Sequence, residues 1–170
     1  MARTAAGSGG VAVFEYRVTK YDPALRDVRG EYTRGEWTAF NDIGRSFGGV
    51  VLTREEYVRV EDAYVASVLA FLREAGLPTL TARDLQNPGG VPGAPVEGSV
   101  LSLGQVGEVI RGLLREEFWC RLEGTGEFVH VGWDYYMYVG VPRACPQAEQ
   151  MAQQLGLFVE PFSSPYREGA

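Results

Sequence analysis

The segment from Phe118 to Val139 constrains the fold of this chain most, because the register of its strands follows from the sequence. Two runs rich in aromatic and β-branched residues flank Thr125 and Gly126, a pattern that predicts a β-hairpin with a short turn. In the register that this turn sets, the opposed pairs are Gly124–Glu127, Leu122–Val129, Cys120–Val131 and Phe118–Trp133. A slip of one residue would turn every side chain to the other face, so the register is strongly specified.

The two faces of this hairpin differ in composition, because side chains alternate across a strand. One face is almost wholly apolar and is expected to face the core; it carries Phe118, Cys120, Leu122, Val129, Val131, Trp133, Tyr135, Met137 and Val139. The other face mixes aromatic with charged groups and carries Trp119, Arg121, Glu123, Phe128, His130, Asp134, Tyr136 and Tyr138.

The mixed face supplies the candidate binding residues, since Trp, Tyr and Arg are the usual energetic anchors of protein interfaces. The candidates are Trp119, Arg121, His130, Asp134, Tyr136 and Tyr138. The more common alternative is a second sheet face that a helix or loop covers, with tyrosine hydroxyls satisfied at its margin.

The sequence gives little support for catalysis or metal binding. Cys120 and His130 lie on opposite faces, so they cannot form a nucleophilic pair within the hairpin. His130 and Asp134 point the same way, but four positions span about 13 Å of strand, so contact would need a bulge at Gly132. One histidine and two isolated cysteines lack the spacing of metal ligands. We therefore expect no metal and no cofactor, and we assign no catalytic residue.

The charge balance limits the classes of partner. The chain has 170 residues, 45% of them hydrophobic, and 16 basic against 22 acidic residues give a formal net charge of −6. Without a basic stripe, nucleic acid is not the expected partner. An acidic surface favours a basic protein partner, although solubility alone also explains it. No signal-peptide pattern and no apolar run of membrane-spanning length occurs, so we expect a cytoplasmic location and no membrane association.

The rest of the chain indicates one domain over residues 11–162, between a flexible tail at 1–10 and a second tail at 163–170. Hydrophobic periodicity and the positions of glycine and proline predict a strand over 11–20, a charged loop to about Gly35, a weaker strand over 36–43, and an edge strand over 157–162. Residues 87–98, rich in proline and glycine, are predicted to form a long loop.

Helices are predicted at three places. The first begins at Thr53, which forms a capping box with Glu56, and ends at Gly76. Its expected core stripe is Tyr57, Val60, Tyr64, Val68, Phe71 and Leu72. The second begins at Ser102 and contains three glycines that either permit close packing or only weaken the helix. The third runs from Pro146 to Leu155.

These elements predict an α+β fold, in which an antiparallel sheet with a central β-hairpin packs against two long helices as a two-layer sandwich. The leading functional hypothesis is a non-catalytic binding protein of the inhibitor, immunity or regulatory type, which engages a basic protein partner through an acidic, aromatic surface. The alternative is a small enzyme or ligand-binding domain, with a pocket between the hairpin face and the 87–98 loop. A third hypothesis, an assembly subunit, predicts stable self-association.

Overall fold

In a computed structural model, the chain folds into an antiparallel sheet backed by helices. The structure describes residues 3–5 and 13–167. Within these residues the main sheet has eight strands in the order β1-β2-β9-β8-β7-β5-β6, and β10 also pairs with β2. The strands are β1 (Arg3–Ala5), β2 (Val13–Thr19), β5 (Thr79–Gln86), β6 (Val100–Ser102), β7 (Trp119–Glu123), β8 (Phe128–Val131), β9 (Met137–Val141) and β10 (Phe158–Pro161). Of the segment expected to be an N-terminal tail, only Arg3–Ala5 are among the described residues.

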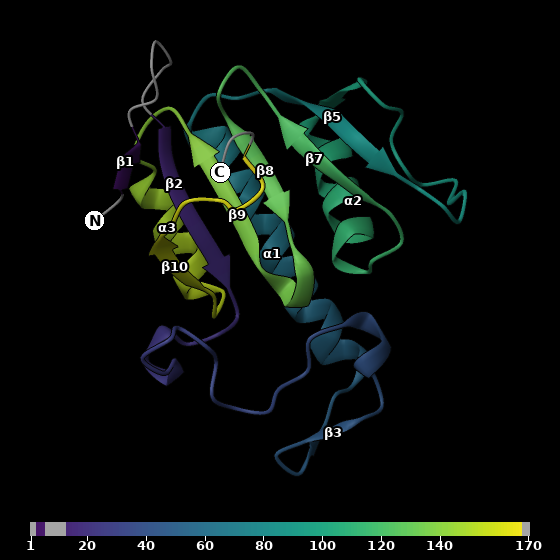
Figure 1. Cartoon of the computed structure of the whole chain (residues 1–170), viewed down its shortest axis with the longest axis vertical. Coiled ribbons are helices and arrows are strands. Elements are labelled where there is room, and N and C mark those ends of the chain that lie inside the picture. The colour runs from purple at the N-terminus through teal and green to yellow at the C-terminus, as the bar shows by residue number, and fades with distance from the viewer. Residues whose placement is uncertain (1–2, 6–12, 168–170) are drawn as a thin grey trace.

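The helices α1 (Arg54–Glu74), α2 (Leu103–Leu114) and α3 (Pro146–Gln154) lie on one face of this sheet (Figure 1). The predicted α+β class is confirmed. The finer prediction, a hairpin against two long helices, is not confirmed, because α3 packs against α1 as a further helix and the sheet extends beyond the hairpin. None of the helices in the described part of the chain is long and apolar enough to cross a lipid bilayer.

Helix α1 is the element that the sequence predicts best. The Thr53 hydroxyl accepts the Glu56 N–H at 3.1 Å, and every residue of the predicted core stripe is buried. The reciprocal half of the capping box is absent, because the Glu56 carboxylate pairs with Arg59 instead. Gly76, at φ +74°, ends the helix as predicted.

The predicted hairpin is confirmed in register at its first turn, where Leu122 pairs with Val129. Its second run is not one strand, however. Strand β8 stops at Val131, a 3-10 turn follows at Trp133–Tyr135, and β9 returns antiparallel to β8. The turn closes because the Gly132 N–H donates to the Tyr136 carbonyl oxygen at 2.8 Å. Trp133 was therefore wrongly placed in the core: its side chain is 73% exposed.

The weaker strand predicted over 36–43 is also wrong. This segment is a loop that contains a 3-10 turn at Phe40–Asp42. The Asp42 carboxylate accepts the N–H groups of Thr38 at 2.9 Å and Ala39 at 3.2 Å. A short acidic side chain that bonds nearby backbone in this way competes with strand pairing.

The C-terminal segment covers the mixed face of β7, β8 and β9, and it crosses the front of the sheet in Figure 1. Residues 163–167, part of the predicted C-terminal tail, lie on this face, and Ser164 is only 2% exposed. The Glu15 carboxylate, also buried, accepts the Ser164 N–H at 3.2 Å and pairs with Arg167. We call residues 162–167 the C-terminal strap. Residues 168–170 lie outside the described part of the chain.

The segment at 87–98 is a loop, as predicted, and it joins β5 to β6. Side chains hold both of its ends. Asn87 exchanges hydrogen bonds with the backbone of Val91, and the Glu97 carboxylate accepts the N–H groups of Asp84 and Leu85. The loop therefore has a defined path beside β5.

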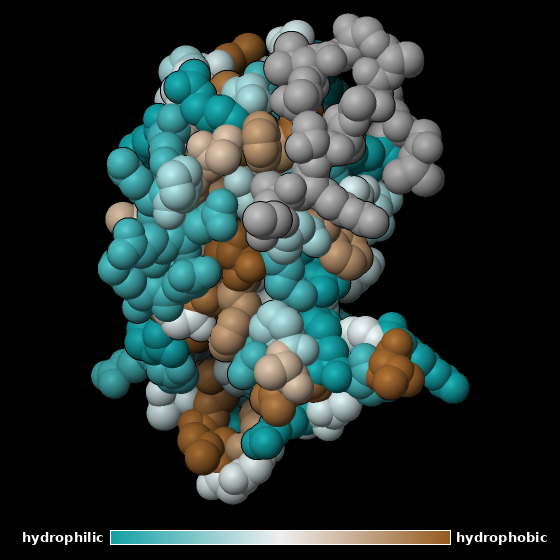
Figure 2. Space-filling view, turned by 90° about the vertical axis from the view of Figure 1, so that its left-hand side faces the viewer, coloured by the Kyte–Doolittle hydropathy of each residue, from teal (hydrophilic) through white to brown (hydrophobic). Residues whose placement is uncertain are grey.

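Exposed apolar side chains gather on the loops between β2 and α1. Figure 2 shows hydrophobic surface at the lower end of the molecule, where these loops lie in Figure 1. Val28 on one loop and Val50 and Val51 on the small hairpin of β3 (Ser46–Phe47) and β4 (Val50–Val51) are exposed. None of them lines either of the two larger cavities described below.

Two of the three glycines of α2 have opposite surroundings, which gives a matched prediction. A Cβ on Gly112 would lie 2.4 Å from the Phe118 ring, whereas one on Gly104 would meet nothing within 4 Å. We expect Gly112→Ala to lower the free energy of unfolding by about 1–3 kcal/mol through overpacking. Gly104→Ala should raise it by about 0.5–1 kcal/mol through helix propensity. Urea unfolding of both variants checks this, and equal effects would contradict the packing argument.

Candidate functional site

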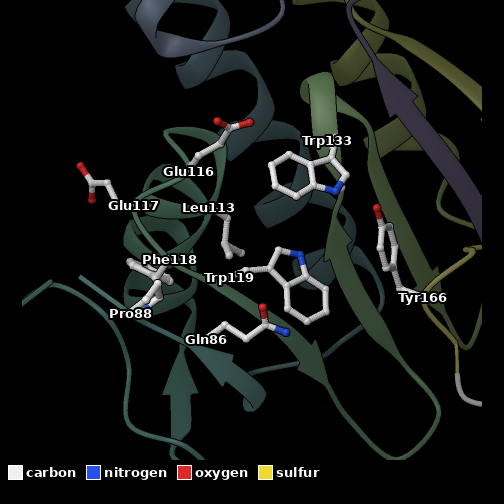
Figure 3. A pocket seen from close by; sticks show the side chains of 10 residues that line it. Gln86, Pro88, Leu113, Glu116, Glu117, Phe118, Trp119, Trp133 and Tyr166 are labelled. Carbon is white, nitrogen blue, oxygen red and sulfur yellow. The ribbon is translucent and has the colours of Figure 1, made fainter. Parts of the chain in front are cut away.

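An aromatic pocket of about 400 Å³ opens where the end of α2, the start of β7, the turn after β8 and the C-terminal strap meet (Figure 3). Its volume falls in the range of ordinary ligand pockets. Its walls are mainly apolar, and carboxylates stand at its margin. The lining residues are Gln86, Pro88, Leu113, Glu116, Glu117, Phe118, Trp119, Gly132, Trp133 and Tyr166.

Trp133 is held over this pocket by an unusual turn. The next two residues, Asp134 and Tyr135, have φ of +58° and +65°, a left-handed conformation that costs non-glycine residues about 1–2 kcal/mol each. The Trp133 side chain makes no hydrogen bond or ring contact with any residue that the structure describes. The turn thus exposes a large aromatic side chain that the fold does not use.

Buried tyrosines fix the strained turn from the core side. The Tyr21 hydroxyl donates to the Asp134 carbonyl oxygen at 2.6 Å, and the Tyr64 hydroxyl donates to the Tyr135 carbonyl oxygen at 2.8 Å. The Tyr135 ring inserts into the core, and its hydroxyl donates to that of Tyr57. A strained backbone conformation persists only where surrounding contacts hold it in place, and these hydrogen bonds and the buried ring do so here.

Glu116, which lines the pocket, also has a strained backbone conformation. It follows α2 at φ +58°, in a Schellman motif where its N–H donates to the Leu113 carbonyl and the Glu117 N–H donates to the Gly112 carbonyl. Glycine is the usual residue at this position. Among the described residues, the non-glycine positions with positive φ are Asp84, Glu116, Asp134 and Tyr135, so three of the four belong to the pocket or to the turn that carries Trp133.

The remaining aromatic walls are rigid. The Trp119 indole N–H donates to the Val131 carbonyl oxygen at 3.0 Å, and its ring lies 5.9 Å from that of Tyr166. Tyr166 approaches the sheet closely because position 132 is glycine: a Cβ there would lie 2.5 Å from the Tyr166 hydroxyl. The strap therefore contributes one wall of the pocket.

The structure does not bring the predicted binding residues onto one surface. Trp119 lines the aromatic pocket, and Asp134 is exposed in the adjacent turn. Tyr136 is half-buried and accepts a hydrogen bond from Arg26, while Tyr138 is buried against Phe162 and Tyr166 of the strap. Arg121 and His130 lie beneath the strap. His130 and Asp134 do not meet, because the chain leaves the strand at Gly132.

Sequence reasoning missed Trp133, Tyr166 and Glu116 as pocket residues. Trp133 was assigned to the core by strand alternation, and Tyr166 was assigned to a tail. Glu116 and Glu117 are adjacent in the sequence, and adjacent helical residues do not face one another, so their spacing gives no sign of a shared site. Gly132 was the available signal, because a glycine inside a strand pattern often marks a break or a close approach.

A Ser–His–Glu arrangement lies under the strap. His130 Nδ1 is 2.7 Å from the Ser164 hydroxyl, and His130 Nε2 is 2.7 Å from a Glu123 carboxylate oxygen. A nucleophile must reach its substrate, but Ser164 and His130 are 2% and 1% exposed. The Ser164 hydroxyl also accepts the Tyr166 N–H at 3.2 Å. In this structure the arrangement fastens the strap to the sheet.

A second cavity, of about 370 Å³, lies beside this arrangement and is lined by charged groups. Two of its three guanidinium groups are already paired: Arg121 with Asp84 and Glu123, and Arg167 with Glu15. Most charges of this cavity thus serve the fold, and the aromatic pocket, with its exposed tryptophan, is the better candidate for ligand binding.

The thiols and the acidic residues supply no further chemistry. Both cysteines are buried, and burial raises the pKa of the Cys120 thiol to about 12 and that of Cys145 to about 11. Both are therefore protonated near neutral pH and are poor nucleophiles. No group of three or more His, Cys, Asp or Glu side chains able to hold a metal ion occurs in the part of the chain that the structure describes.

No family model, curated protein or solved structure matches this chain. The function is therefore argued from the pocket itself.

Proposed function

We propose that this chain is a non-catalytic binding protein that engages a basic protein partner through the surface around the aromatic pocket, as inhibitors, immunity proteins and regulatory subunits do. The observation that carries the proposal is the display of Trp133. Folded chains expose single hydrophobic residues often, but they seldom keep a strained turn to hold an unpartnered tryptophan over a cavity.

Composition and charge support a protein partner. Tryptophan and tyrosine are the most common anchors of protein interfaces, and this pocket offers Trp119, Trp133 and Tyr166 together. The pocket margin carries Glu116 and Glu117, and the chain has a net charge of −6. A basic partner would be steered toward such a surface and would be favoured over acidic competitors.

The test is affinity capture from the source lysate with matched baits: the wild-type chain, Trp133→Ala and Val50→Ala. Val50 is 71% exposed, close to the 73% of Trp133, but lies away from the pocket. We expect Trp133→Ala to weaken partner binding about 30-fold or more, as for an interface anchor. Its stability should change by less than about 0.5 kcal/mol, because the side chain is exposed and unpartnered. Val50→Ala should bind as the wild type does.

A partner that binds all three baits equally would contradict the proposal. So would the absence of any specific partner when the baits are folded.

The alternative is a ligand-binding or small enzymatic domain, with its pocket between the hairpin face and the 87–98 loop. One observation favours this alternative: Trp119 of that face and Pro88 of that loop line the same cavity. It predicts that a small metabolite raises the melting temperature of the wild type but not of Trp133→Ala. Cytoplasmic location and the absence of nucleic-acid partners remain predictions from composition.

A further inference from the structure

We infer that the aromatic pocket binds an arginine side chain of the partner, with the guanidinium group between the two indoles and against the Glu116 carboxylate. This inference rests on the proposed function and specifies the group that the same site recognises.

The charge of the pocket selects a cation. Glu116 and Glu117 line it, no basic residue does, and the Glu116 carboxylate has no hydrogen bond or ion pair with any residue that the structure describes. In Figure 3, Glu116 extends toward Trp133, and Glu117 lies further out. A guanidinium in the pocket would give Glu116 the charge-assisted partner that the fold does not supply.

The shape of the pocket selects a planar cation. Figure 3 shows the indoles of Trp119 and Trp133 on opposite sides of the pocket, with Tyr166 at one end. Both indoles line the cavity, and no ring contact joins them in the described part of the chain. Guanidinium stacks flat on aromatic rings and is more weakly hydrated than an ammonium group, so arginine fits better than lysine.

The backbone at Glu116 supports this role independently. Its left-handed conformation is one that glycine would adopt without steric cost, and the Schellman hydrogen bonds around it need only backbone atoms. A glutamate at this position is thus unfavourable for the helix end. Binding through its carboxylate is the contribution that glycine would not make.

The test uses the wild-type chain and four capped amino-acid probes: the Nα-acetyl methylamides of arginine, lysine, citrulline and leucine. Citrulline keeps the size of arginine but has no charge. The readout is the indole N–H signals in two-dimensional NMR, assigned by single Trp→Phe variants. We expect the arginine probe to shift the signals of Trp119 and Trp133 with a dissociation constant of about 1 mM. The signal of Trp37, which is buried in the core, should not move.

The probes and two variants decide between explanations. Citrulline should bind about tenfold more weakly than arginine, because cation–π attraction and ion pairing are both lost, and lysine should bind between the two. Glu116→Gly should weaken arginine binding about fivefold or more and should also raise the melting temperature, a combination that a purely structural role does not give. Glu55→Gln, on the exposed face of α1, is the matched control and should leave binding unchanged.

The inference is overturned if arginine and citrulline bind equally, if leucine binds best, or if no probe shifts the two pocket indoles. These results would leave the proposed function standing, provided that partner capture still depends on Trp133. If partner capture did not depend on Trp133 but arginine still bound, the proposed protein partner would be contradicted and the arginine site would remain supported.

Discussion

Glu61→Ala is expected to lower the free energy of unfolding by about 3–5 kcal/mol, because it removes one side of a buried ion-pair network. The Glu61 carboxylate is completely buried and binds Arg115 through both oxygens, at 2.6 Å and 2.8 Å. It also binds Arg111 at 3.0 Å and accepts the Tyr57 hydroxyl at 3.2 Å. Without it, Arg115 would lose its ion-pair partner and Arg111 would keep only partners at the surface, although each arginine side chain is only 29% exposed.

The neighbouring residue provides the control for this prediction. Asp62 also binds Arg111, at 2.7 Å, but its side chain is 55% exposed. Exposed ion pairs contribute little, so Asp62→Ala should change stability by less than about 1 kcal/mol. Urea unfolding at neutral pH measures both variants. Equal losses for the two would show that burial of Glu61 does not decide its contribution.

A triple replacement separates the requirement for charge from the requirement for packing. Changing Glu61 to leucine and both Arg111 and Arg115 to methionine removes the charges together and keeps most of the volume. Buried ion networks replaced as a whole often give proteins of similar stability, so we expect this variant to recover most of the loss of Glu61→Ala. A triple variant as unstable as the single one would mean that the network contributes directional bonding that apolar packing cannot replace.

The elements that could be predicted from the sequence are those that local periodicity determines. The core stripe of α1 repeats at helical spacing, and the alternation of β7 and β8 admits one register that buries the apolar set. Periodicity did not single out Glu61, however, although its carboxylate is the deeply buried one, on the side of α1 that meets α2. Which side of a helix a neighbour covers is a tertiary property that periodicity on one helix does not contain.

The pocket could not be predicted for a similar reason. The turn that exposes Trp133 depends on hydroxyl groups of Tyr21 and Tyr64, which lie far away in the sequence. The covering of the polar face depends on residues 163–167, whose composition gives no sign of burial. Only Gly132 carried a local signal of the break, and strand alternation alone favoured the continuous strand.

His130→Ala is expected to lower the free energy of unfolding by about 3 kcal/mol and to release the C-terminal strap. The imidazole links Ser164 of the strap to Glu123 of β7, and its ring stacks on Phe128 at 4.4 Å. Its removal leaves a buried hydroxyl without its partner and opens a cavity beside Phe128, and each effect costs about 1–3 kcal/mol. Amide hydrogen exchange should show the release as lost protection at Ser164 and Tyr166, whose N–H groups bond to Glu15 and Ser164.

Release of the strap should also alter the pocket, because Tyr166 forms one wall of it. We therefore expect His130→Ala to weaken binding of the arginine probe, although His130 lines no part of the cavity. Ser164→Ala, which removes the same contact from the other side and leaves the imidazole stacked, should give the same exchange pattern with a smaller loss of stability. A His130→Ala variant that keeps full protection at Tyr166 would show that Glu15 and Arg121 suffice to hold the strap, since both bond to it. The Ser–His–Glu arrangement would then contribute to stability alone, and the shape of the pocket would be independent of it.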